Sequence, residues 1–194
     1  TLPESALAAY PLAAATIGVD FGGNGSGHAF ACSGFTRGFG GLITLSEWYH
    51  KGEITPEKLE MAFVDFARQC AKEYGVRTAY CDSAEPTLIL GLRAACVRER
   101  LPLEVRKARK GSINGRIRFL CGLMAGNRYR IAKGCQKTRD ALQNAVWDGR
   151  HTTEDVRLDD GTTNIDSLDA LEYSFEPYME DMITLSMKNA GVFS

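Results

Sequence analysis

The sequence lacks several features that would narrow its function at once. Its six cysteines include no C-x-x-C pair, and several lie inside apolar runs, so neither a zinc site nor a disulfide framework is expected. The apolar stretch of residues 6–15 contains a proline and follows no basic region, which excludes a signal peptide or a membrane span there. No internal repeat or low-complexity tract is present.

The bulk composition is that of an ordinary globular domain. The chain has 194 residues, of which 44% are apolar and 24% are charged, and this length supports one domain with a substantial core. The first residue is Thr rather than Met. We therefore expect residues 1–14 to be a linker from an upstream domain and residues 15–194 to form a single domain.

The net charge of −1 hides a strong segregation of charge along the chain. Residues 105–139 contain eleven basic residues and no acid, whereas residues 140–194 contain twelve acids and three basic residues. Such runs are often only solvated helix faces, but the complete absence of acids favours a phosphate-binding surface. The residues expected to contact phosphates are Arg106, Lys107, Arg109, Lys110, Arg116, Arg128 and Arg130.

The hydrophobic pattern predicts a mixed α/β domain. Residues 15–21, 28–35 and 41–50 read as three strands with short glycine-rich connections, which favours an antiparallel meander. A helix is predicted from Pro56, with Thr55 as its cap and Gly75 at its end. Two short strands (76–81, 103–106), further helices (86–100, 112–124, 136–147, 165–185), a brief extended segment (128–131) and a loop (148–164) follow.

Right-handed strand–helix–strand crossovers would make the later strands parallel to the first, in a five-stranded mixed sheet. Asp20 and Asp82 each end a strand, so this topology makes them neighbours at the carboxyl edge of the sheet. Asp166 and Asp169 open the last predicted helix, on one face. Carboxylate oxygens in such an arrangement favour Mg²⁺ or Mn²⁺.

Each acid also has a purely structural interpretation. Asp20 could begin a turn, Asp82 could cap the following helix, and Asp166 or Asp169 could be favoured by the helix dipole. The aromatic residues Trp48, Tyr49 and Trp147 are expected to pack in the core or at the sheet edge rather than stack on bases.

Four segments resemble the nuclease domain at the C-terminus of the large terminase subunit of tailed bacteriophages, a ribonuclease H-like domain. They are residues 17–22 (IGVDFG), 79–84 (AYCDSA), 107–117 and 166–173 (DSLDALEY). The resemblance spans residues 15–180 and implies a metal-dependent endonuclease that cuts double-stranded viral DNA during packaging. The metal ligands that it implies, for two Mg²⁺ or Mn²⁺ ions, are Asp20, Asp82 and Asp166, with Asp169 as a possible additional ligand.

The same resemblance implies several partners. No Walker A motif occurs in the sequence, so an ATPase domain is expected upstream, with the portal protein and the small terminase subunit as further partners in the host cytoplasm. Two other interpretations stay open. A Holliday-junction-resolvase-like nuclease would use the same chemistry on branched DNA, and an actin-like or sugar-kinase-like lobe would use the glycine-rich segment 20–26 to bind ATP.

Overall fold

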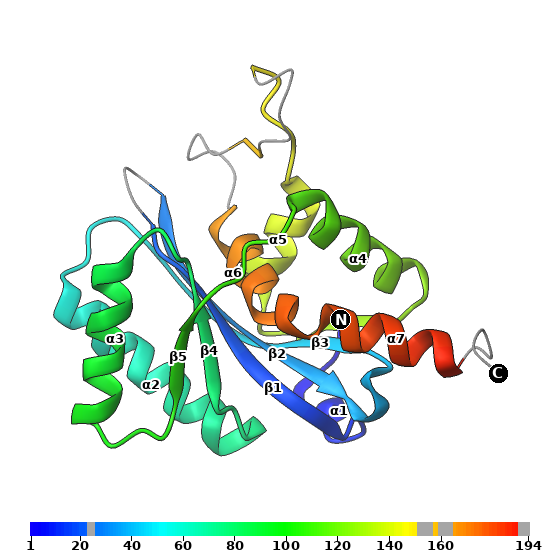
Figure 1. Cartoon of the computed structure of the whole chain (residues 1–194), viewed down its shortest axis with the longest axis horizontal. Helices are drawn as coiled ribbons and strands as arrows, with labels where there is room; N and C mark the ends of the chain where they lie inside the picture. The colour runs from blue at the N-terminus through cyan, green and yellow to red at the C-terminus, as the bar shows by residue number, and fades with distance from the viewer. Residues whose placement is uncertain (23–25, 151–156, 159–164, 190–194) are drawn as a thin grey trace.

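A six-stranded mixed sheet forms the centre of the domain (Figure 1). The computed structural model describes residues 1–22, 26–150, 157–158 and 165–189. The strand order is β5-β4-β1-β2-β3-β6. The strands are β1 (Leu12–Asp20), β2 (Gly27–Thr36), β3 (Leu42–Lys51), β4 (Thr78–Cys81), β5 (Glu104–Lys107) and β6 (Tyr129–Ile131).

The pairing confirms the predicted ribonuclease H-like arrangement and adds one strand to it. β1, β2 and β3 form the antiparallel meander, while β4 runs parallel to β1 and β5 parallel to β4. The prediction of five strands was wrong by one, because residues 129–131 pair in parallel with the edge of β3. The sequence predicted this segment as briefly extended, but three residues carry too little pattern to show that they join the sheet.

The N-terminal residues belong partly to the domain. β1 begins at Leu12, three residues before the predicted strand, because its first residues pair with the end of β2. The short helix α1 (Glu4–Leu7) precedes it, and the Leu2 N–H donates to the Ile131 carbonyl at 2.8 Å. This contact covers part of the outer edge of β6, where unpaired backbone groups would otherwise be exposed.

Two helices cover one face of the sheet (Figure 1). The longer one, α2 (Pro56–Tyr74), has the predicted ends: the Thr55 hydroxyl accepts a hydrogen bond from the Lys58 N–H at 3.4 Å, and Gly75 has a φ of 71°. Its neighbour is α3 (Pro86–Arg98). The large side chains of Phe63 and Leu92 are fully buried between these helices and the sheet, so this layer forms a conventional hydrophobic core.

The opposite face carries the helices that matter for the site, α4 (Ile113–Ala125), α5 (Gln136–Asn144) and α6 (Asp166–Phe175) (Figure 1). The backbone of α6 lies almost directly on β1, because a Cβ atom added at Gly18 would come within 1.8 Å of the Ala170 carbonyl oxygen. The Thr16 hydroxyl donates to the Ser174 carbonyl at 2.6 Å. Small and hydroxyl side chains therefore bring the start of α6 to the end of β1.

The predicted last helix is in fact two helices. α6 ends at Phe175, a 3₁₀ turn (η2, Glu176–Tyr178) follows, and α7 (Met179–Asn189) continues the chain. Pro177 explains the break, since proline has no N–H to donate and its ring clashes with the preceding turn. No helix within the described ranges is both long and apolar enough to cross a membrane.

The segment after α5 also differs from the prediction. α5 ends at Asn144 rather than at residue 147. Trp147 instead pairs with Arg157 in an isolated antiparallel bridge, and its side chain is 47% exposed rather than packed. Most of the predicted loop 148–164 lies outside the described residues.

Candidate metal and nucleic-acid site

Parallel pairing of β1 with β4 places two predicted site residues next to each other. Val19 and Cys81 are register partners, and the Asp82 N–H donates to the Val19 carbonyl at 2.9 Å. Asp20 and Asp82 therefore leave the sheet side by side at its carboxyl edge. The first turn of α6, with Asp166 and Asp169, lies at the same edge because α6 packs on β1.

Among the carboxyls of the site, Asp20 has the most strongly raised pKa. Only 7% of its surface is exposed, and within the described residues its side chain has no hydrogen bond or ion pair. Burial raises the pKa of Asp20 well above its usual value, and the nearby carboxylates of Asp169, Asp166 and Asp82 raise it further. The ammonium group of Lys110 opposes them. These mutual effects show that the four acids converge on one region.

Asp166 is held by hydrogen bonds to the loop between β1 and β2. One carboxylate oxygen accepts from the Ser26 hydroxyl. The other accepts from the Gly27 N–H at 2.9 Å and, more weakly, from the Tyr49 hydroxyl at 3.4 Å. Both oxygens are therefore directed toward the sheet, and only 3% of the residue is exposed.

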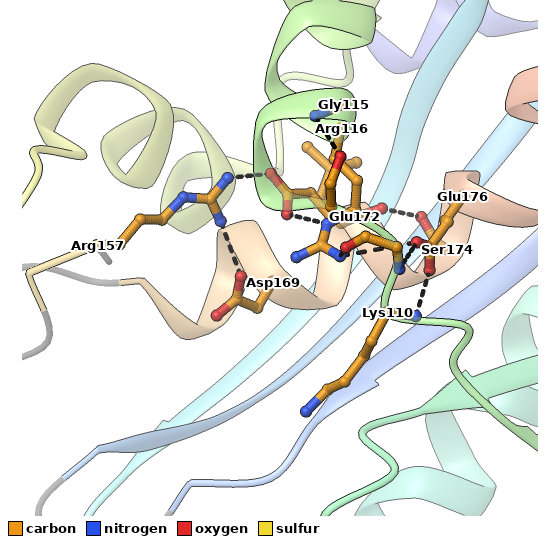
Figure 2. Close-up of polar contacts among 11 residues, drawn as sticks. Lys110, Gly115, Arg116, Arg157, Asp169, Glu172, Ser174 and Glu176 are labelled. Carbon is orange, nitrogen blue, oxygen red and sulfur yellow. Dashed lines mark hydrogen bonds and ion pairs between the residues drawn. The ribbon is translucent and has the colours of Figure 1, made fainter. Parts of the chain in front are cut away.

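Asp169 faces Asp20 and pairs with an arginine. Among the charged neighbours of Asp20, Asp169 has the largest effect on its pKa. The Arg157 guanidinium donates to the Asp169 carboxylate at 2.8 Å (Figure 2). Burial raises the pKa of Asp169 to about 6, even though Arg157 lowers it. Its position and its raised pKa make Asp169 a better candidate ligand than the sequence suggested.

Lys110 extends from the segment after β5 into the acidic group. Its ammonium pairs with the Asp82 carboxylate and lies 5.7 Å from the centre of the Tyr173 ring. Its backbone has a φ of 52°, an uncommon conformation for a residue with a side chain. A constraint of this kind requires support from the surrounding structure.

Glu176 supplies that support (Figure 2). Its carboxylate accepts hydrogen bonds from the backbone N–H groups of Lys110, at 2.9 Å, and of Gly111. The Arg116 guanidinium donates to the Gly111 carbonyl at 2.6 Å. The backbone that carries Lys110 is thereby fixed to the end of α6, and its side chain is directed at the acids.

Behind this segment lies a buried ion-pair network (Figure 2). The carboxylate of Glu172 pairs with Arg116 at 2.7 Å and with Arg157 on its other oxygen, while Arg116 also lies 3.7 Å from Glu176. Sequence reasoning missed this network. The only available signal was the spacing of Asp169, Glu172 and Glu176, which places three acids on one helical face.

The structure divides the predicted phosphate-contacting residues into separate groups. Arg106, Lys107 and Arg109 are exposed on or just after β5, which ends at the same carboxyl edge of the sheet as β4 and Asp82. Arg116 is buried, with 7% of its surface exposed, and belongs to the ion-pair network. Arg128 and Arg130 lie beside β6, at the other edge of the sheet.

The side chains as they stand do not form a closed metal site. Across the described ranges, no three Asp, Glu, His or Cys side chains lie close enough together to hold a metal ion. The contacts explain this, because Asp82 is turned toward Lys110, Asp166 toward Gly27, and Asp169 toward Arg157.

The donor chemistry nevertheless fits hard divalent cations. Six carboxylates in this region share three cationic side chains among the described residues. The acids are Asp20, Asp82, Asp166, Asp169, Glu172 and Glu176, and the cations are Lys110, Arg116 and Arg157. A buried excess of oxygen ligands and negative charge is the environment that Mg²⁺ and Mn²⁺ prefer.

Comparison with solved structures shows which proteins share this fold. The large terminase of a thermophilic bacteriophage matches with a TM-score of 0.65 and 18% identity, over 84% of this chain and 39% of that protein. The fold is that of a terminase nuclease domain. The nuclease domain of the large terminase of bacteriophage SPP1, solved with bound Mn, matches with a TM-score of 0.60 and 19% identity, over 86% of this chain and 87% of that domain.

A third relative, the large terminase nuclease of the thermophilic phage G20c with bound magnesium, has a TM-score of 0.55 and 15% identity, with 84% and 80% of the two chains covered. No protein-family model and no curated protein matches the chain. The chain spans about two fifths (39%) of the first of these terminases but most of the two isolated nuclease domains.

Proposed function

We propose that this domain is a metal-dependent endonuclease that cuts double-stranded DNA. The observation that carries the proposal is the buried carboxyl of Asp20, which faces three other acids at the carboxyl edge of the sheet. The domains of the same fold from SPP1 and G20c, solved with Mn and with magnesium, support divalent cations as cofactors.

Asp20, Asp82 and Asp169 are the residues that would hold two such ions. When bound, the ions supply the Lewis acidity that phosphodiester hydrolysis requires. Asp20 ends β1, which pairs with β4 on one side and is covered by α6 on one face. It is therefore next to both Asp82 and Asp169 and is the candidate shared ligand. Asp82 and Asp169 would exchange their present cationic partners, Lys110 and Arg157, for metal.

Asp166 has a different role in this proposal. Sequence reasoning favoured Asp166 over Asp169 as the third ligand, but its two oxygens already accept hydrogen bonds from Ser26 and Gly27. We assign Asp166 to fastening the loop after β1 to the first turn of α6. That contact keeps Asp20 and Asp169, which lie on the two joined elements, in register with each other.

The basic side chains would hold the DNA backbone. If Asp82 held a metal ion, Lys110 would be free of its present ion pair and would be placed to contact a phosphate near the reacting group. Arg106, Lys107 and Arg109 extend the positive surface along β5 and supply affinity without reading sequence. Arg116 acts inside the protein, where it holds the backbone beside Lys110.

The biological setting is genome packaging in a tailed bacteriophage. The proposal includes an ATPase domain of the same protein, and the portal protein and small terminase subunit as partners, in the host cytoplasm. The first of the three terminases supports a further domain in the same protein, because the matched region is only 39% of that large terminase chain.

A plasmid-cleavage assay with Mn²⁺ tests the proposal. We expect the wild-type domain to nick and linearise the plasmid, and Asp20→Asn and Asp169→Asn to lose at least about a thousandfold in rate. Loss of a metal ligand should exceed the roughly tenfold to hundredfold effect of an outer partner. Undiminished cutting by both variants would remove the proposal. Preference for a four-way junction over linear duplex would instead favour the resolvase-like alternative.

A further inference from the structure

A second cationic feature lies at the end of the sheet opposite the acids. A surface pocket of about 260 Å³ is lined by Arg37, Arg128, Arg130 and Asn127, together with backbone and apolar groups. It lies beside the end of β2 and the start of β3, and Thr36 at this end pairs with Leu12, the first residue of β1. We call this feature the arginine pocket.

Backbone carbonyls orient two of the three guanidinium groups. Arg128 donates to the Gly40 carbonyl at 2.5 Å and to the Phe39 carbonyl at 3.3 Å. Arg130 donates from one nitrogen to the carbonyls of Asn127, at 2.7 Å, and Tyr129, at 3.0 Å. Hydrogen bonds to carbonyls fix the direction of a guanidinium without neutralising its charge.

The described residues that line the pocket carry positive charge and include no acid. None of the described residues that line it is Asp or Glu, and neither Arg37 nor Arg130 has an ion pair within the described part of the chain. Arginines usually meet carboxylates or phosphates, because their planar donors match those anions. A pocket with several guanidiniums and no carboxylate in its described lining is therefore suited to an external oxyanion.

The volume of the pocket favours some phosphate-containing ligands over others. Pockets that enclose a whole small-molecule ligand usually have volumes of about 300–1,000 Å³. At about 260 Å³, the arginine pocket can receive a phosphate with its adjoining sugar but does not enclose a complete nucleoside triphosphate. A phosphate within a polymer backbone fits this size better than a free nucleotide does.

We propose that the arginine pocket binds a backbone phosphate of DNA, at a position remote from the cleavage site. The inference rests on the proposed function, which supplies DNA as the substrate. The nine residues of β1 make eight steps from Leu12, near the arginine pocket, to Asp20, which corresponds to about 26 Å at about 3.3 Å per step. A duplex that reaches both sites must therefore span at least about eight base pairs at ~3.4 Å each.

Binding of a fluorescent 30-base-pair duplex to Asp20→Asn protein, which cannot cut, provides the test. In that background, Arg37→Ala combined with Arg130→Ala should weaken binding by about fivefold to tenfold for every DNA sequence. It should also reduce the slope of log affinity against log salt by about 1–2. The matched control is Lys58→Ala combined with Lys72→Ala, which removes the same charge from the exposed face of α2 and should change both quantities less.

Two outcomes would overturn the proposal. The first is equal loss of affinity in the pocket and control variants. The second is an unchanged DNA affinity accompanied by a loss of ATP-induced thermal stabilisation, which would assign the pocket to a nucleotide. Arg37→Ala alone repeats the measurement without removing any described side-chain contact, should the double variant not fold. Plasmid cutting by the unmodified chain is scored separately, so failure of the nuclease proposal would be visible on its own.

Discussion

Two groups of charged side chains meet α6 about one helical turn apart and differ in how their charge is balanced. Glu172, in the middle of the helix, is paired with Arg116 and Arg157. Asp20, which faces the first turn of the helix, meets three carboxylates and has no ion pair within the described residues. The first group is a scaffold whose charges satisfy one another, whereas the second carries an excess of negative charge.

The difference shows why burial of charge alone does not identify a functional site. A buried ion pair contributes little net stability, yet removing one partner is costly because the other charge stays behind. A buried carboxyl among like charges costs stability as long as it is ionised. Such a cost is commonly found where a ligand or metal completes the site.

The largest effect on stability is expected when the ion-pair network around Glu172 is broken. Glu172→Gln leaves Arg116 and Arg157 without their shared carboxylate, and we expect it to lower the free energy of unfolding by about 3 kcal/mol. Urea denaturation followed by circular dichroism measures this. The control, Glu104→Gln, breaks the exposed pair with Arg106 and should leave the denaturation midpoint unchanged. Equal midpoints for the two variants would contradict the scaffold role.

A smaller effect on stability is expected at the close contact between Gly18 of β1 and Ala170 of α6. Gly18→Ala would force a Cβ atom against the Ala170 carbonyl, so we expect a loss of about 1–3 kcal/mol in unfolding free energy and weaker DNA cutting. The matched control is Gly122→Ala in α4, where an added Cβ meets nothing within 4 Å. That variant should gain up to about 1 kcal/mol from the higher helix propensity of alanine. A neutral Gly18→Ala would show that α6 can move away from β1 without consequence.

A third comparison separates fastening from metal binding at Asp166. The single side-chain oxygen of asparagine can still accept from the Gly27 N–H, and its amide NH2 can donate to the Ser26 hydroxyl oxygen, but asparagine is a poorer metal ligand. Alanine can neither make these hydrogen bonds nor bind metal. We therefore expect Asp166→Asn to keep most plasmid cutting and Asp166→Ala to lose about tenfold or more. Ser26→Ala should lose less than Asp166→Ala. If Asp166→Asn is as inactive as Asp20→Asn, then Asp166 is a ligand and the fastening role is wrong.

The smallest effect concerns the stability of the metal-free protein. The pKa of Asp20 is raised by folding, so its ionised form opposes folding at neutral pH. Asp20→Asn should then raise the melting temperature by about 2–4 °C at pH 7.5 in the presence of EDTA. The gain should disappear below about pH 4, where the wild-type carboxyl is protonated in both states. A lower melting temperature for the variant at neutral pH would contradict the claim that the ionised Asp20 carboxylate destabilises the metal-free protein.

The sequence predicts the elements on which the acids lie. Strand ends and crossover topology were enough to make Asp20 and Asp82 neighbours, because parallel strands finish at one edge of a sheet. The caps of α2 were also readable, since Thr55 and Gly75 act on groups only a few residues away. Local signals of this kind need no knowledge of the rest of the fold.

What the sequence could not show depends on contacts between distant residues. The hydrogen bonds that occupy the Asp166 carboxylate come from Ser26 and Gly27, which are more than 130 residues away in the sequence. The link between Arg157 and Glu172 and the positive φ of Lys110 likewise arise only after packing. Pro177 was visible, however, and the break that it causes between α6 and α7 should have been predicted.

Calorimetric titration of Mn²⁺ into the protein is the most direct measurement of the central claim, that the excess of carboxylates around Asp20 is a cation site. We predict saturable binding by the wild-type domain that is lost in both Asp20→Asn and Asp169→Asn and retained in Glu104→Gln. Absence of Mn²⁺ binding by the wild-type domain, or equal binding by all four proteins, would contradict the claim.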